Sequence, residues 1–258
     1  MAPADVHPLY ADATTRAALH ALLDATWPGI ARRLAVAAAL GWRWDEITTP
    51  FVAREEGRIV AHVGVLDLPT RLAGRDVCLA GVHAVCTDPA FRRRGHFRTA
   101  MREALAHVDA RHGAAKLHTD QPWLYEPLGF RVVPQHRFRL ARAGPRGRGR
   151  RLAAADVPAL RDLLRRRAPV SDAFAARDEG WLFVIDEMIA RGDLRRLAVV
   201  DEPRMIVVCE VVDRVLRVHD VVALAVPPLA DVLAAAPAPF EAAELWMPAD
   251  RLAPGAEV

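Results

Sequence analysis

Hydrophobic residues recur at helical spacing through the first forty residues of the chain. Between Thr14 and Leu40 apolar residues recur at broadly helical spacing, as in a helix with one buried face, and Pro28 interrupts the series. The recurring positions are Ala17, Leu19, Ala21, Leu22, Trp27, Ile30, Leu34 and Ala38. The pattern therefore predicts two helices that meet at the proline.

From Phe51 onwards the pattern becomes that of strands. Phe51 to Arg54, a Glu56-Gly57 turn and Ile59 to Leu66 predict a hairpin, and Val77 to Thr87 predicts a third strand. In the second strand of the hairpin, alternate residues are expected on one face: Ile59, Ala61, Val63 and Val65.

An amphipathic helix is predicted after an arginine-glycine loop, and we expect Gly113 to close it. Its apolar residues are Phe97, Ala100, Met101, Ala104, Leu105 and Val108. Beyond this helix the sequence predicts a short strand at 116–119, a turn or short helix at 121–126 and a final strand at 130–140.

The second half of the chain repeats this order of elements. It contains helical patterns at 156–166, 180–190 and 229–235, and strand patterns at 197–200, 205–212, 215–222 and 244–247. A glycine- and arginine-rich segment, 144–151, separates the halves, so we predict a domain over 1–143, a linker over 144–151 and a second domain over 152–258. The second copy has Ala225-Val226-Pro227-Pro228 in place of the arginine-glycine loop, which predicts that it keeps the fold and has lost the ligand.

Composition narrows the functional classes. With 35 basic and 32 acidic residues the formal net charge is +3, which argues against a protein that coats nucleic acid. Three cysteines in predicted strands are too few for a disulfide framework and indicate a reducing compartment, for which we expect the cytoplasm. We expect no signal peptide in the first ten residues and no membrane span, because no uninterrupted apolar run reaches ~18 residues.

Arg92-Arg93-Arg94-Gly95-His96 carries the strongest chemical signal. Glycine permits a tight bend, the first N–H groups of the following helix lack partners within the helix, and the helix dipole is positive at that end. Together with three guanidinium groups, these features suit a pyrophosphate.

The segment from Val82 to Phe97 resembles the acetyl-CoA signature of the GNAT N-acetyltransferase superfamily, a strand followed by R-x-x-G-x-G/A. Phe97 stands where Gly or Ala is usual. This departure, the three arginines and the preceding Ala80-Gly81 are similar to the enhanced-intracellular-survival branch, which comprises aminoglycoside and lysine N-acetyltransferases. Tyr125, four residues before Gly129-Phe130, resembles the Y-x-x-x-G-[FY] close of the GNAT core.

The resemblance implies an α/β fold (an α+β mixed sheet), with a GNAT domain followed by a degenerate GNAT-like domain, and acetyl-CoA as cosubstrate. It implies that the pantetheine arm lies along Val85, Cys86 and Thr87, and that the pyrophosphate is held by the loop and helix start, Arg92, Arg93, Arg94, Gly95, His96, Phe97 and Arg98. That branch has a third, carrier-protein-like domain with no counterpart in these residues, which leaves open whether a C-terminal carboxylate acts as the base.

Acetyl transfer to an amine needs a base for the amine proton and an acid for the leaving thiolate. The resemblance implies that Tyr125 is the acid. His83, on the strand, and His118, seven residues before the tyrosine, are both candidates for the base, and Asp120 is a candidate anchor for the amine. Trp44, Asp45 and Glu46 either line the acceptor pocket or lie on the surface.

We predict no metal site, because His107, His112 and His118 surround a helix end without the tight spacing of zinc ligands and the cysteines are expected to be remote from them. The expected acceptor is a small-molecule amine or a lysine-bearing protein, with no nucleic-acid or membrane partner, and both a monomer and a homo-oligomer stay open. Two alternatives remain: a non-catalytic acyl-CoA-binding regulator on the same fold, and a nucleic-acid binder acting through the arginines at 146–151.

Overall fold

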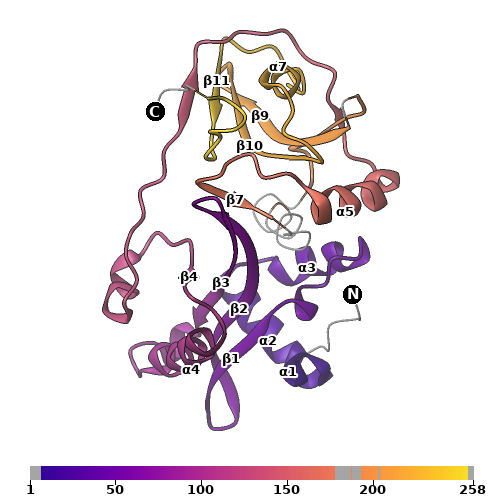
Figure 1. Ribbon diagram of the computed structural model, residues 1–258. Helices are drawn as coiled ribbons and strands as arrows, with labels where there is room; N and C mark the ends of the chain where they lie inside the picture. Colours follow the sequence, from indigo (N-terminus) through magenta and orange to yellow (C-terminus); the bar gives the residue numbers. More distant parts are fainter. Residues whose placement is uncertain (1–6, 178–186, 188–192, 203, 255–258) are drawn as a thin grey trace. The chain divides into compact units, whose positions relative to one another are not determined.

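The computed structural model describes residues 7–177, 187, 193–202 and 204–254. The chain divides into two compact units: unit 1 comprises 1–68, 78–119 and 181–192, and unit 2 comprises 69–77, 120–180 and 193–258. Both units have mixed α/β structure (Figure 1). The predicted boundary near residue 144 is therefore replaced by a division in which the chain passes between the units several times.

Unit 1 begins with α1 (Pro8–Ala11), α2 (Ala13–Thr26) and α3 (Ile30–Ala39). The Asp12 carboxylate accepts a hydrogen bond from the Thr15 amide and caps α2, while Gly29, with φ of +83°, starts α3. The two helices predicted on either side of Pro28 are confirmed, and α1 was not predicted.

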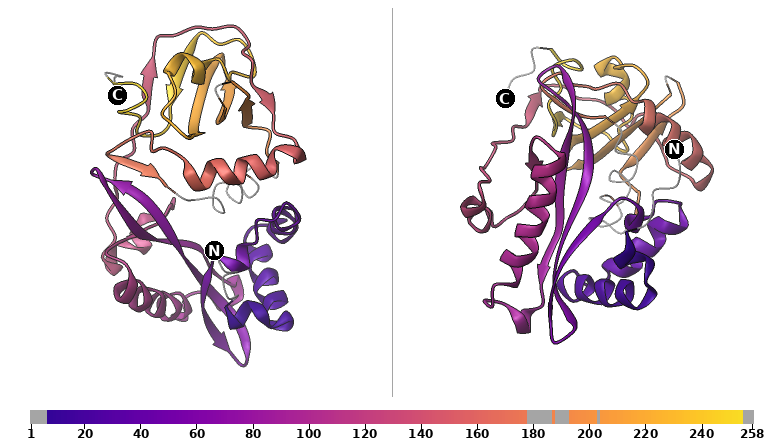
Figure 2. Two further views of the ribbon diagram at one scale, coloured as in Figure 1. Left: turned by 45° about the vertical axis from the view of Figure 1, so that its right-hand side comes forward. Right: turned by 60° about the horizontal axis from the view of Figure 1, so that its bottom comes forward.

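The sheet of unit 1 has the order β1-β2-β3-β4, formed by β1 (Thr49–Glu55), β2 (Arg58–Leu72), β3 (Arg75–Thr87) and β4 (Ala115–Lys116). The predicted hairpin and third strand are confirmed and are longer than expected. Val60, His62 and Gly64 are buried along with the predicted face of β2. Figure 2 shows the reason, since α4 covers one side of the strands and α1 to α3 cover the other.

Helix α4 (His96–Arg111) buries Ala100, Met101, Ala104 and Val108, as the spacing predicted. Its end differs from the prediction. His112 takes an extended conformation and donates its amide to the Val108 carbonyl, so Gly113 does not form the cap.

Two predicted strands are much shorter than expected. Of 116–119 only Lys116 is in a strand, and of 130–140 only β5 (Phe138–Leu140) is; β5 pairs with β11 (Ala242–Leu245) in unit 2. The apolar residues Val132 and Val133 are exposed and pair with no strand in the described part of the chain, so their strand-forming composition does not produce a strand here. The turn or short helix predicted at 121–126 is confirmed by two 3₁₀ helices, Pro122–Leu124 and Glu126–Leu128.

Unit 2 contains a sheet of order β5-β11-β10-β9-β8-β6, with β6 (Arg150–Arg151), β8 (Leu197–Val200), β9 (Met205–Val212) and β10 (Val215–Ala223). Helices α5 (Val157–Arg166) and α7 (Leu229–Leu233) accompany it. The predicted elements of this half are confirmed except for the helix at 180–190, which lies outside the described residues apart from Glu187.

The two sheets have the same order of strand connections. In unit 1, β3 pairs in parallel with β4 after α4, and in unit 2, β10 pairs in parallel with β11 after α7. Each is preceded by antiparallel strands in sequence order, β1-β2-β3 and β8-β9-β10. This supports the predicted internal repeat.

The predicted linker, 144–151, is instead part of the second sheet. Gly144 forms a bridge with Phe240, and Arg150 and Arg151 pair with β8. Backbone groups here approach Ala234 and Ala235 so closely that a Cβ on Gly147 or Gly149 would collide with their carbonyl oxygens. The glycines therefore serve close packing rather than flexibility.

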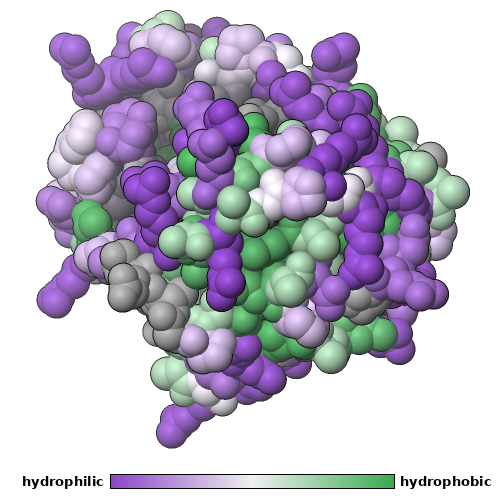
Figure 3. All heavy atoms as spheres, turned by 90° about the horizontal axis from the view of Figure 1, so that it is seen from above, coloured by the Kyte–Doolittle hydropathy of each residue, from purple (hydrophilic) through white to green (hydrophobic). Residues whose placement is uncertain are grey.

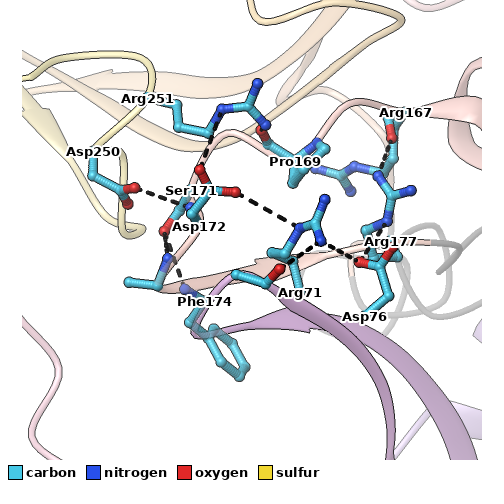
Figure 4. A network of polar contacts seen from close by, with 12 residues as sticks. Arg71, Asp76, Arg167, Pro169, Ser171, Asp172, Phe174, Arg177, Asp250 and Arg251 are labelled. Atoms are coloured by element: carbon cyan, nitrogen blue, oxygen red, sulfur yellow. Dashed lines mark hydrogen bonds and ion pairs between the residues drawn. The ribbon is translucent and has the colours of Figure 1, made fainter.

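The tip of the β2–β3 hairpin belongs to unit 2, where β7 (Phe174–Ala176) pairs with the end of β2. A polar network surrounds this contact (Figure 4). Arg71 reaches Asp76 and Asp172, Arg177 also reaches Asp76, and the Asp172 amide donates to Asp250. Opposite charges in the network are matched, which indicates a structural role.

None of the helices in the described part of the chain has the length and apolar character needed to cross a membrane. The face seen in Figure 3 carries many hydrophilic side chains, with hydrophobic residues between them.

Candidate active site

The centre of unit 1 is built around an irregularity in β3. Ala84 has a φ of +50°, which departs from the extended backbone of the strand, and its carbonyl oxygen lies 2.8 Å from His62 Nδ1. Because a carbonyl oxygen only accepts, Nδ1 carries the proton, and Nε2 accepts a hydrogen bond from the Tyr10 hydroxyl at 3.1 Å. A buried relay from α1 through β2 therefore holds the backbone of β3 at Ala84.

Trp44 packs at the middle of this cluster. Its ring centroid lies 5.4 Å from that of Tyr10, 5.8 Å from that of His62 and 5.6 Å from that of His83. Trp44 is buried, whereas Asp45 and Glu46 are half-buried and both pair with Arg43. The predicted acceptor-pocket triplet thus divides into a core residue and two carboxylates held by an arginine.

His83 sits beside Thr48 and His62. Its Nε2 lies 3.4 Å from the Thr48 hydroxyl oxygen, and Gly64 leaves room for the ring, since a Cβ there would lie 2.8 Å from the same nitrogen. Burial, followed by the proximity of His62, lowers the pKa of His83 to about 3, and burial lowers the pKa of His62 to about 4. Both rings are therefore neutral at pH 7, and His83 is a weak base.

The arginine-glycine loop joins the end of β3 to α4. Asp88 accepts from the Ala90 amide and pairs with Arg58, while Arg92 Nε donates to the Thr87 carbonyl. Arg93 and Gly95 have left-handed backbone conformations, with φ of +63° and +89°. Left-handed residues at such a turn direct successive N–H groups to one side, which forms a concave site for an anion.

Glu55, at the end of β1, contacts this loop and was missed in the sequence. One of its oxygens lies 2.7 Å from Arg94 Nη1 and the other 2.6 Å from His96 Nε2. The Phe91 ring has the guanidinium groups of Arg94 and Arg58 over it, at 5.1 and 5.2 Å. Arg94 is therefore oriented before any ligand arrives, while the side chains of Arg92, Arg93 and Arg98 are exposed.

The strand residues that precede the loop are partly enclosed. Cys86 is buried, and burial raises the pKa of its thiol to about 11, so the thiol stays protonated. Val85 and Thr87 are half-buried, and Phe97 is half-buried at the start of α4. The structure thus places the predicted cofactor residues from Val85 to Arg98 on one continuous strand, loop and helix.

Tyr125 belongs to unit 2, between the two 3₁₀ helices. Its side chain is buried, with its ring 5.9 Å from that of Phe130, and its pKa is raised above 10 by burial and by Asp120. The phenol is therefore protonated at neutral pH. His118 lies in unit 1 with an exposed side chain, and Asp120 is exposed in unit 2.

Residues 42–133 match the family model described as an acetyltransferase (GNAT) domain. Over these residues the chain is similar to GNAT acetyltransferase domains. Domains of this family use acetyl-CoA, and the match includes every residue that the sequence suggested for cofactor, acceptor or catalysis, from Trp44 to Tyr125. A comparison with curated proteins finds no match.

Solved structures with the GNAT fold resemble this chain over most of its length. A probable N-acyltransferase from Enterococcus faecalis V583 is 12% identical, with a TM-score of 0.57, covering 90% of this chain and 62% of its own. Eis1 from Mycobacterium abscessus is 20% identical, with a TM-score of 0.56 and coverage of 77% and 56%. A GCN5-related N-acetyltransferase from Kribbella flavida is 18% identical, with a TM-score of 0.54 and coverage of 94% and 62%.

At these identities the similarity concerns the fold, and it extends beyond the GNAT domain into unit 2. The chain spans about three-fifths of the length of these proteins. The fold class expected from the sequence, including the resemblance to the enhanced-intracellular-survival branch, is confirmed at this level.

Proposed function

We propose that the protein is an N-acetyltransferase that transfers acetyl from acetyl-CoA to a primary amine by direct attack in a ternary complex. The observation that carries the proposal is the arginine-glycine loop of the GNAT domain, with left-handed Arg93 and Gly95 at the start of α4. We assign the pyrophosphate to this loop and the pantetheine arm to the backbone of Val85, Cys86 and Thr87.

Glu55 adds a detail to cofactor binding. Its carboxylate holds Arg94 and His96 in place, and a bound pyrophosphate would share the Arg94 guanidinium with it. Because Glu55 neutralises part of the positive charge, we assign the main attraction for the phosphates to the exposed Arg92, Arg93 and Arg98 together with the loop amides.

The base must be strong enough to take a proton from an amine. His83 is poorly suited to hold that proton, since its pKa is about 3. We therefore favour His118, directly or through water, and give His83 the role of a neutral hydrogen-bonding partner for the acceptor. Although the side chain of His118 is exposed, partial desolvation by the surrounding chain, followed by the positive charge of Lys116, lowers its pKa below 6.5, so its ring is neutral at pH 7 and can accept a proton.

The acid must protonate the thiolate of CoA as it leaves. Tyr125 is our candidate, because its raised pKa keeps the phenol protonated at neutral pH. The acceptor is proposed to be a small-molecule amine or a protein lysine, with Asp120 as an exposed carboxylate available to the ammonium group. A cytoplasmic location is likewise a proposal.

The test is a thiol-release assay with acetyl-CoA and a panel of aminoglycosides, polyamines and lysine peptides. Tyr125→Phe should lower kcat about 100-fold on any amine that is turned over, with the Kd for acetyl-CoA unchanged. Tyr10→Phe, at the other of the two tyrosines, is the matched control and should retain most of the activity.

The possible outcomes separate the alternatives. Binding of acetyl-CoA without turnover of any amine would favour the acyl-CoA-binding regulator, and absence of binding would overturn the assignment of the loop. The nucleic-acid alternative is weakened by ion pairs, since Arg148 pairs with Asp231 and Arg150 pairs with Asp156 and Asp201. Salt-dependent DNA binding that is lost on substitution of these arginines would support the nucleic-acid alternative.

A further inference from the structure

A second cluster of reactive side chains lies at the opposite end of α4 from the arginine-glycine loop. Asp67 on β2, Cys78 on β3 and His112 at the end of α4 each contribute a donor atom, and these atoms lie within 4.8 Å of one another. The sequence interpretation that the cysteines are remote from the histidines is therefore wrong for this pair.

The fold explains how residues so far apart in sequence meet. Asp67 and Cys78 lie on the two arms of the β2–β3 hairpin, and α4 returns the chain to β3, where the Ala80 amide donates to the Ala114 carbonyl at 2.9 Å. His112 lies two residues before that contact. The cluster thus depends on the strand, helix and strand arrangement of the GNAT domain, which sequence spacing alone does not reveal.

The donors are arranged with one buried side and one open side. The His112 side chain is only 4% exposed, and its Nε2 lies 2.9 Å from Asp67 Oδ1. The Asp67 side chain is 77% exposed and Cys78 is also exposed. An imidazole is therefore fixed against the protein by a carboxylate, beside an accessible thiol.

We propose that Asp67, Cys78 and His112 bind a zinc ion, with water in the fourth position. Sulfur, imidazole nitrogen and carboxylate oxygen are the donor types that zinc takes in proteins, and three protein ligands with one open position is a known form of tetrahedral site. On binding, the imidazole proton lies on His112 Nδ1 so that Nε2 binds zinc in place of its hydrogen bond to Asp67, and the Cys78 thiol gives its proton to solvent.

The site is remote from the proposed acetyl-CoA loop. Helix α4 has 16 residues, which corresponds to about 24 Å of length between its two ends. Zinc would join β2 and β3 to the end of α4, so it should stabilise the GNAT domain without taking part in acetyl transfer.

The experiment titrates the metal-free full-length protein with Zn²⁺ by calorimetry, and with Co²⁺ by absorption spectroscopy. We expect one Zn²⁺ per chain, with a Kd of about 1 µM or tighter. We also expect a thiolate-to-cobalt charge-transfer band and a rise in the melting temperature with Zn²⁺. Cys78→Ser and His112→Asn should each weaken binding about 100-fold, and Cys78→Ser should abolish the band.

Cys209→Ser is the control, since this thiol is buried in the core of unit 2 and is not one of the three clustered residues, and it should bind Zn²⁺ as the unaltered protein does. Circular dichroism and acetyl-CoA binding of each metal-free variant check that it folds. A Zn²⁺ affinity that is unchanged in Cys78→Ser, or a Kd weaker than about 100 µM in the unaltered protein, would overturn the proposal.

Discussion

The most informative residue that sequence patterns overlooked is His62. It occupies a buried position on β2, outside the set of alternate residues that the sequence predicted on one face, and its two ring nitrogens connect Tyr10 to the carbonyl of Ala84. Glu55 is a similar case, because it is the last residue of β1, just before a turn, yet it contacts the arginine-glycine loop 39 residues later in the chain. Both roles depend on which strands become neighbours, so local spacing does not reveal them.

The relay makes a prediction about His62 as a positioning residue. If it holds the Ala84 carbonyl and thereby the backbone around Val85, His62→Leu should lower kcat about 10- to 100-fold. It should also change the ratio of the affinities for acetyl-CoA and CoA, which differ only at the acetyl group. His62→Asn can still donate to Ala84 from its side-chain amide and should retain most activity.

The measurement is the ratio of the two affinities together with kcat for each variant. Tyr10→Phe is a further control, because it removes the hydroxyl donor and leaves the His62 bond to Ala84 in place. Equal losses in His62→Asn and His62→Leu would contradict the positioning role and leave His62 as a packing residue.

A second prediction at the residue scale concerns the stability of the fold at acidic pH. Burial lowers the pKa of His62 to about 4 from an ordinary value of 6.5, so the unfolded chain binds a proton there that the folded chain does not. The contribution of the neutral His62 ring to the free energy of unfolding is complete above pH 6.5. It is lost as the pH falls towards 4, by about 3 kcal/mol. Thermal melting from pH 7.5 to 4.5 should show this decline.

His62→Asn should flatten the pH dependence of the melting temperature between pH 6.5 and 4.5. His136→Asn, at an exposed histidine, should melt with the same dependence as the unaltered protein. An unchanged slope in His62→Asn would show that other groups account for the acid sensitivity.

Gly95 gives a third prediction. Its φ of +89° is unfavourable for any side chain, although space around it is open, so Gly95→Ala should distort the loop. We expect the Kd for acetyl-CoA to rise about tenfold, which corresponds to ~1.4 kcal/mol. Gly29→Ala, with a φ of +83° at the start of α3 and similarly open space, is the matched control and should leave the Kd unchanged.

At the scale of elements, strongly periodic segments were predictable and the end of the GNAT core was not. The two helices around Pro28, the β1–β2 hairpin and α4 follow directly from apolar spacing. The segment from Phe130 to Leu140 has equally strand-like composition, but only β5 finds a partner, and that partner is β11 in unit 2. Strand formation requires a neighbouring edge, and composition does not identify one.

This difference is measurable by amide hydrogen exchange. Amides in β5, paired through Phe138 and Leu140 with β11, should exchange more slowly than those at 131–137, which are in no strand and are exposed. Protection that extended over 131–137 would instead support the longer strand predicted from the sequence.

At the scale of the whole molecule, the two units share a strand, helix and strand arrangement but differ at the turn before the helix. In unit 1 that turn carries four consecutive positions, Arg92 to Gly95, suited to an anion, and α4 continues for 16 residues. In unit 2 it is Ala225-Val226-Pro227-Pro228, and α7 has only five residues. Proline lacks an N–H group and a short helix has a weak dipole, so both donors and charge are lost there.

We therefore expect one acetyl-CoA per chain rather than two. Calorimetric titration of the full-length protein should give a stoichiometry near one, and Gly95→Ala should weaken that single site without revealing another. Arg148, the arginine close to α7, already pairs with Asp231 of that helix, which opposes binding of a second pyrophosphate. A stoichiometry near two, with one site unaffected by Gly95→Ala, would mean that the second unit binds CoA by contacts other than a phosphate loop.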